Sequence, residues 1–164
     1  MTLVVALITP TLVPAQDVTE PSLKAAYLLR FMSFTEWPPD AVAPNAPLVA
    51  CVVADNPVAD ALQRDVKGRT INAHPISVAR NSSPRGCHLL YLGGGALAPA
   101  LLGLQGFQDA PVLTMSDVDG FAQAGGLAQF YFEHSKLKFI VNMATLKRTR
   151  LHMSALLLQL AKRI

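Results

Sequence analysis

The stretch that decides the fold runs from residue 112 to the end of the chain. It reads VLTMSD at 112–117, GFAQAGG at 120–126 and NMATLKRTRLHMSALLLQLAKR at 142–163. Val112 to Met115 is a short apolar run closed by Ser116 and Asp117, which predicts a buried strand that ends in a turn. Two further apolar runs, 127–132 and 137–141, flank the polar residues Glu133-His134-Ser135-Lys136. A four-residue polar connection suits two antiparallel strands, so the sequence predicts a hairpin here.

Two polar residues predict helices after the hairpin. Asn142 can cap a short helical turn through Lys147, and Ser154 can cap a final helix. Two lines of residues are expected on that final helix, one formed by Ala155, Leu158 and Lys162 and the other by Leu156 and Leu160. Because the apolar face is wide, the final helix is expected to pack on a sheet.

Helices and strands alternate upstream of this stretch. Thr19-Glu20-Pro21 marks the start of a helix that is expected to run to about Glu36, before Trp37-Pro38-Pro39. Buried strands are expected at 48–54 and 87–92, short strands at 70–72 and 76–79, and helices at 58–66 and 96–104. This order predicts a three-layer α/β fold, in which a mostly parallel sheet is flanked by helices and carries a C-terminal antiparallel hairpin.

Length and composition favour one domain behind an export signal. The 164 residues, 51% of them hydrophobic and 15% charged, are enough for one globular domain with a real core, which we assign to residues 16–164. Residues 1–15 are apolar and uncharged, and Val13-Pro14-Ala15 places small residues before Gln16, as a signal-peptidase site needs. The sequence therefore predicts a partial signal peptide at 1–15. The alternative is a disordered or core-packed tail.

The two cysteines, Cys51 and Cys87, each accompany an apolar run. An even cysteine count in an exported chain suggests a disulfide. If the two strands are neighbours in a parallel sheet, the sulfur atoms can meet, provided that the Cα atoms lie within about 7 Å. Two buried free thiols are the alternative, and export favours the bridge.

Catalytic and cofactor motifs are missing from the sequence. The four histidines, at 74, 88, 134 and 152, lack metal-binding spacing, and Ser116-Asp117 is better explained as a strand-end turn in which Asp117 caps the following backbone N–H groups. Gly93-Gly94-Gly95 lies between a strand and a helix, where phosphate binds in many nucleotide folds, but no P-loop residues follow. The sequence predicts a protein that is not an enzyme and holds no metal or cofactor, with a small-ligand or nucleotide-binding domain as the alternative.

Charge is distributed unevenly along the chain. Residues after 135 carry seven Lys and Arg and no Asp or Glu, a net charge of +7, whereas residues 1–135 carry −4. Such a segment can mark an acidic partner, a nucleic acid or a membrane surface, and a solvated face is the ordinary alternative. Export makes nucleic acid an unsuitable partner, so we expect an acidic protein surface or anionic lipid headgroups.

Several motifs together resemble the YfiR family. They are KAAYL at 24–28 with Phe31, Phe34, Trp37 and Pro38, then CHLLY at 87–91, LTMSD at 113–117, Gly120-Phe121 and Gly125-Gly126. The C-terminal pattern of Asn142, Lys147-Arg148, Leu151, Ser154 and 157–161 also fits, whereas Thr149-Arg150 stands where the family is expected to have small residues or Gly. The resemblance covers essentially everything after residue 20.

The resemblance implies a periplasmic regulator without enzymatic activity. Such a protein binds and represses the periplasmic sensor domain of an inner-membrane diguanylate cyclase, or a sensor kinase, and an outer-membrane lipoprotein releases it. We expect Arg148, Arg150 and His152 to form the partner-binding surface, with Leu146 pointing inward. A homodimer that pairs strand edges at the hairpin is a further expectation.

Overall fold

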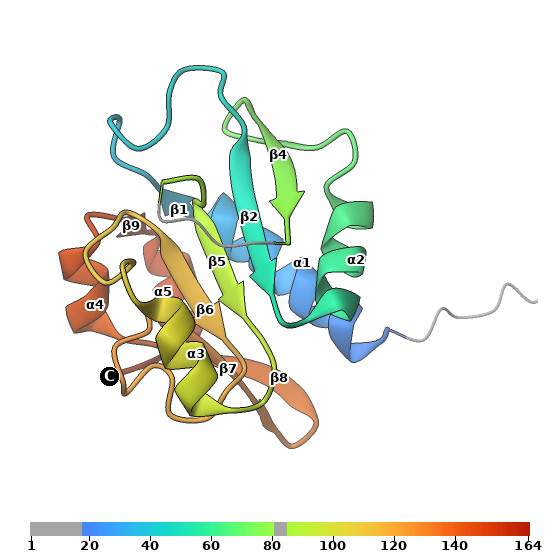
Figure 1. The fold of residues 1–164 in the computed structure, drawn as a ribbon, viewed down its shortest axis with the longest axis vertical. Coiled ribbons are helices and arrows are strands. Elements are labelled where there is room, and N and C mark those ends of the chain that lie inside the picture. The colour runs from blue at the N-terminus through green and yellow to red at the C-terminus, as the bar shows by residue number, and fades with distance from the viewer. Residues whose placement is uncertain (1–17, 81–84) are drawn as a thin grey trace, which may run out of the picture.

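A mixed sheet of eight strands forms the centre of the computed structural model, which describes residues 18–80 and 85–164 (Figure 1). The expected signal peptide at 1–15 lies outside the described residues. The strands lie in the order β10-β8-β7-β6-β5-β2-β4-β3. Their bounds are β2 Leu48–Val53, β3 Thr70–Ile71, β4 His74–Ala79, β5 Leu89–Leu92, β6 Leu113–Ser116, β7 Ala128–Glu133, β8 Lys136–Val141 and β10 Lys162–Arg163.

The sheet is mostly parallel, as the sequence predicts. Strands β4, β2, β5, β6 and β7 pair in parallel, and β7 and β8 form the antiparallel hairpin. The helices are α1 Glu20–Ser33, α2 Asn56–Asp65, α3 Leu97–Leu104, α4 Met143–Arg148 and α5 Ala155–Leu160. We call the ends where the parallel strands begin the amino edge of the sheet, and the opposite ends the carboxyl edge.

Alternate residues of the central strands build two separate cores. Ala50, Val52 and Tyr91 face the core that α1 and α2 cover, whereas Cys51 and Leu90 face the core that α3 covers. Successive side chains of a strand point to opposite faces, so continuous apolar runs are needed when both faces are buried. The expected three-layer arrangement is confirmed.

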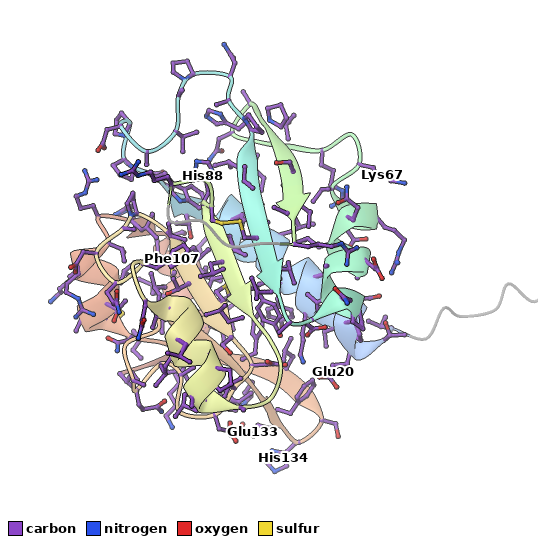
Figure 2. All side chains as sticks on the ribbon, viewed as in Figure 1. Glu20, Lys67, His88, Phe107, Glu133 and His134 are labelled. Atoms are coloured by element: carbon purple, nitrogen blue, oxygen red, sulfur yellow. A yellow bond between two sulfur atoms is a disulfide. The ribbon has the colours of Figure 1, made fainter. Side chains whose placement is uncertain are left out.

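The second core contains the disulfide that the cysteine count suggests. Cys51 and Cys87 are joined by a disulfide, with their Cα atoms 5.8 Å apart, and they lie 36 positions apart in the sequence. The bond lies close to His88, where the chain crosses from β4 to β5 (Figure 2). It ties Cys87, two residues before β5 begins, to Cys51 in β2 at the centre of the sheet.

The first helix ends earlier than the sequence suggests. Thr19 caps α1 as expected, but the helix stops at Ser33 rather than Glu36. Thr35–Glu36 forms strand β1, which pairs antiparallel with β9, His152–Met153. A strand partner more than 100 residues away overrides the local helical pattern, because pairing satisfies backbone groups that the helix end leaves open.

The hairpin and the final helix also differ in detail from the expectation. Strands β7 and β8 extend through Glu133 and Lys136, leaving a two-residue turn in which His134 and Ser135 have φ values of 48° and 59°. Asn142 and Ser154 cap α4 and α5 as expected. The expected apolar face of α5 is wrong: the helix has six residues, and Leu157 is buried while Leu156 and Leu160 are exposed. Lys162 lies beyond the helix in β10.

His88 holds the amino edge together. The Val49 N–H donates to His88 Nδ1 (3.0 Å), so the neutral ring carries its proton on Nε2, which donates to the Ala41 carbonyl (3.2 Å). Burial lowers the pKa of His88, and the nearby His74 lowers it further, outweighing the bond to Ala41 that raises it. The Trp37 indole donates to the His88 carbonyl (3.2 Å). His88 is therefore a structural residue.

Candidate functional site

The amino edge carries all three residues of the expected partner-binding surface. Arg148 is the last residue of α4, Arg150 follows two positions later, and His152 lies in β9. All three are exposed, whereas Leu146 is buried beneath them. Arg150 has a φ of 59°, in the left-handed region that glycine adopts most easily. This explains why a small residue or Gly is expected at this turn.

Arg148 and Arg150 are each paired with an aspartate of the same chain. Arg150 is bidentate to Asp40, with Nη1–Oδ1 and Nη2–Oδ2 distances of 3.2 and 3.1 Å. The hydrogen bond from Arg150 keeps the pKa of Asp40 below its ordinary value. Arg148 Nε lies 3.8 Å from Asp109 Oδ1. Asp40 and Asp109 come from distant segments, so the sequence offers no local signal for either pair.

These pairs reduce the charge asymmetry seen in the sequence. Three of the seven basic residues after 135 pair with carboxylates from the more acidic part of the chain. The pairs are Lys138 with Glu133, Arg148 with Asp109 and Arg150 with Asp40. A partner that takes Arg150 must therefore replace Asp40.

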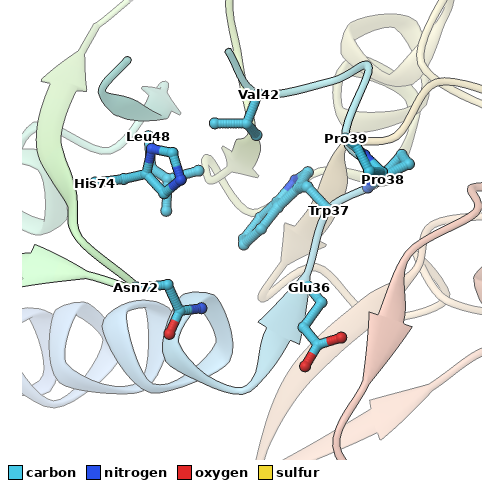
Figure 3. A pocket seen from close by; sticks show the side chains of 8 residues that line it. All are labelled: Glu36, Trp37, Pro38, Pro39, Val42, Leu48, Asn72 and His74. Atoms are coloured by element: carbon cyan, nitrogen blue, oxygen red, sulfur yellow. The ribbon is translucent and has the colours of Figure 1, made fainter. Parts of the chain in front are cut away.

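Two hollows adjoin this surface. One, of about 320 Å³, lies between Trp37 and His74 and is bordered by Glu36 (Figure 3). The other, of about 360 Å³, is lined by His152, Phe34 and Glu36. Glu36 is shared because β1 pairs with β9 and places it opposite His152. The sequence placed Glu36 in a helix, so this neighbourhood was not foreseen.

The glycine-rich turn does not form a phosphate cradle. A Cβ atom on Gly93 would lie 2.6 Å from the Cβ of Asp55, so the turn after β2 fills the space above this glycine. Asp55 Oδ1 accepts from the Val58 N–H and caps α2. A carboxylate packed against the turn repels phosphate. Gly93 serves close packing, whereas Gly94 and Gly95 have positive φ values of 103° and 76° that a tight turn requires. This explanation disfavours the nucleotide-binding alternative.

A buried ion pair occupies the carboxyl edge. The Lys24 ammonium lies 2.5 Å from Asp117 Oδ2 and 2.6 Å from Glu20 Oε1, and the exposed fraction of the Lys24 side chain is 7%. Burial alone lowers the pKa of Lys24, but the hydrogen bonds and charges of Asp117 and Glu20 outweigh it and hold the pKa above its ordinary value. The expectation that Asp117 caps the following turn is wrong, because Ser116 Oγ accepts from the Val118 N–H (3.1 Å).

Tyr91 lies beneath this pair. The phenol is fully buried, and its hydroxyl lies near the Asp117 carboxylate, although the two do not form a hydrogen bond of good geometry. Burial raises the pKa of Tyr91 well above 10.0, and the charges of Asp117, Asp55 and Glu20 raise it further. The phenol therefore stays protonated in the folded protein.

Stability should fall at alkaline pH, and a Tyr91→Phe variant should resist this fall. Above pH 10 the unfolded chain releases the Tyr91 proton while the folded protein keeps it, so a rise in pH favours unfolding. Between pH 9 and 11 the variant should lose about 1.4 kcal/mol less unfolding free energy than the wild type. Urea unfolding at both pH values measures this. Equal losses in the two proteins would show that Tyr91 does not contribute.

The fold and site define a disulfide-bonded, three-layer α/β domain with polar clusters at both edges of its sheet. The sequence profile of the YfiR/HmsC-like family matches residues 21–162, so the chain belongs to this family. No curated protein sequence matches the chain. Within residues 18–80 and 85–164, no helix is long and apolar enough to cross a membrane.

Proposed function

We propose that this protein is a non-enzymatic periplasmic regulator that binds and represses the periplasmic sensor domain of an inner-membrane diguanylate cyclase, and so modulates cyclic di-GMP signalling and biofilm formation. The observation that carries the proposal is the family match over residues 21–162. The disulfide between Cys51 and Cys87 is consistent with an oxidising compartment. An outer-membrane lipoprotein would release the repressed partner, and a sensor kinase is the alternative target.

The partner surface in this proposal is Arg148, Arg150 and His152 at the amino edge. Arginine pairs with carboxylates bidentately, and Arg150 already adopts this geometry with Asp40. An acidic loop of the sensor domain would take the place of Asp40. The neighbouring hollow is lined mostly by polar residues, among them His152, Glu36 and Asn72, and would receive a polar side chain next to that loop.

Replacing both arginines by alanine should weaken binding to the isolated sensor domain of the cyclase encoded nearest this gene. We expect a loss of about 2 kcal/mol or more, since hot-spot arginines contribute that much at the centre of an interface. Isothermal titration calorimetry measures the affinity. The matched control is Lys162→Ala with Arg163→Ala, which removes two exposed cations from β10. Equal affinities of the two double variants would move the interface away from the arginines.

The Asp40→Asn variant tests the same surface, but it is expected to strengthen binding instead of weakening it. The substitution removes the internal competitor of Arg150, so it should tighten binding about threefold or more. The gain should vanish when Arg150→Ala is also present, because no guanidinium is then released. The same gain in both backgrounds would mean that Asp40 acts through general charge and not through Arg150.

A homodimer that pairs strand edges at the hairpin has only part of the outer edge of β8 available. The outer edge of β8 pairs with β10 at Ile140 and Val141, so that part of the edge is covered. A dimer through the hairpin would therefore use the segment of β8 near Lys136 and Leu137. This remains a proposal about assembly.

A further inference from the structure

The final helix turns an apolar face to solvent. Leu156 and Leu160 lie four positions apart on one side of α5, and their side chains are 64% and 66% exposed. Leu157 is buried in the core that α1 covers, and Leu158 packs against the same core. Figure 1 shows α5 behind the sheet, on the side opposite α3. The two exposed leucines therefore form an outer face of the protein on the side of α1.

Two cations follow this face directly in the sequence. Lys162 and Arg163 form β10, and both side chains are exposed. Neither forms an ion pair with any of the described residues, whereas three other cations of the C-terminal segment do. Residues 142–164 contain no Asp or Glu. We call Leu156, Leu160, Lys162 and Arg163 together the α5 surface.

Strand pairing places Arg163 on the same side of the sheet as the two leucines. It lies opposite Val141 in the parallel pairing of β10 with β8. Paired residues of neighbouring strands project from the same face of a sheet, and Val141 lies in the core that contains Leu157 of α5. Lys162 projects from the other face, but β10 is the edge strand, so this long side chain is not covered by a further strand.

The chemistry of the α5 surface fits an anionic lipid layer. Cations attract the phosphates of the headgroups, and exposed leucines can enter the boundary between headgroups and acyl chains. Basic side chains can keep their charged ends at the headgroups while their alkyl stems cover apolar surface. Glu36 and Ala155 line one hollow, so a carboxylate lies near the start of α5 and the cations lie beyond its end. The end of the helix is therefore the part that would approach an anionic layer.

We propose that the α5 surface docks the protein on an anionic lipid bilayer without crossing it. The two leucines enter the headgroup region, and the two cations pair with phosphates there. A contact of this size gives weak, reversible binding. The docking goes beyond the proposed repressor function, and it can be measured without a partner protein.

Flotation of the mature protein with unilamellar vesicles tests the charged part of the α5 surface. Vesicles of phosphatidylcholine and phosphatidylglycerol, mixed about 7:3, should bind at least about tenfold more tightly than phosphatidylcholine alone, and salt should weaken the binding. Lys162→Ala with Arg163→Ala should weaken binding to the mixed vesicles about tenfold. The matched control is Arg64→Ala with Lys67→Ala, which removes the same charge near the end of α2 and should leave binding nearly unchanged.

A leucine variant tests the apolar part. Leu160→Gln should weaken binding to the mixed vesicles about fivefold, because a polar amide then enters the headgroup boundary. The matched control is Leu102→Gln, since Leu102 is 65% exposed on α3, on the opposite side of the sheet. This control should bind like the wild type. Both side chains are exposed, so the two variants should keep the wild-type melting temperature.

Three results would overturn the proposal. The first is the absence of binding to the mixed vesicles up to about 5 mM lipid. The second is an equal effect of Leu160→Gln and Leu102→Gln, or of the two double variants, because binding would then reflect general apolar or charged character. The third is a Leu160→Gln variant that loses affinity for the isolated sensor domain and keeps its vesicle binding, since the α5 surface would then belong to a protein interface.

Discussion

Replacing Lys24 by methionine is expected to lower the free energy of unfolding by about 3 kcal/mol. Methionine nearly matches the length of the lysine side chain, so packing is largely kept. Asp117 would then remain in a site where its carboxylate is only 23% exposed and has lost its cation. Breaking a buried ion pair from one side typically costs 3–5 kcal/mol, and the partial exposure of Asp117 places the expectation at the lower end.

Chemical unfolding at neutral pH measures this effect. Lys138→Met is the matched control, because Lys138 pairs with Glu133 on the exposed hairpin and its loss should change stability little. Adding Asp117→Asn to Lys24→Met should restore part of the stability, since the unpaired charge is then removed. If Lys24→Met changed the free energy of unfolding as little as Lys138→Met, the ion pair of Lys24 and Asp117 would not contribute to the stability of the fold.

Loss of the disulfide is expected to cost about 4 kcal/mol. In the chain-entropy model, a cross-link that closes a loop of this length stabilises the fold by that amount, through restriction of the unfolded chain. The Cys51→Ala, Cys87→Ala variant should therefore unfold at much lower denaturant concentration than the wild type. Both sulfur atoms lie in the core under α3, so lost packing adds to the effect.

A reductant provides the internal control for this prediction. It should lower the stability of the wild type close to that of the double variant and leave the variant unchanged. Thiol titration of the denatured, unreduced wild type should find no reactive thiol. Two reactive thiols per chain would contradict the bridge.

Features that depend on neighbouring residues could be predicted from the sequence. Asn142 and Ser154 were identified as helix caps because a cap acts on the N–H groups of the next turn. The apolar runs at 48–54 and 87–92 predicted buried strands, and the side chains of β2 and β5 lie in the two cores on opposite faces of the sheet. The resemblance to the YfiR family, which was based on motifs spread over the chain after residue 20, is confirmed by the family match.

Features that depend on distant pairing could not be predicted in this way. The ion pair of Lys24 and Asp117 joins residues 93 positions apart, and that of Arg150 and Asp40 joins residues 110 positions apart. The end of α1 was misplaced for the same reason, because Thr35 and Glu36 pair with β9. The face of α5 was misjudged because a helix of six residues is too short for periodicity to decide which side packs.

Hydrogen exchange of the backbone amides, measured with and without the isolated sensor domain of the cyclase, tests the central claim most directly. The regulatory account predicts that the partner slows exchange in residues 147–153 and in β1, at the amino edge. It predicts no change at the carboxyl edge, in the hairpin tip around His134 or in the turn around Asp119. Protection confined to the carboxyl edge, or no protection anywhere under conditions that saturate the sensor domain, would contradict a partner surface formed by Arg148, Arg150 and His152.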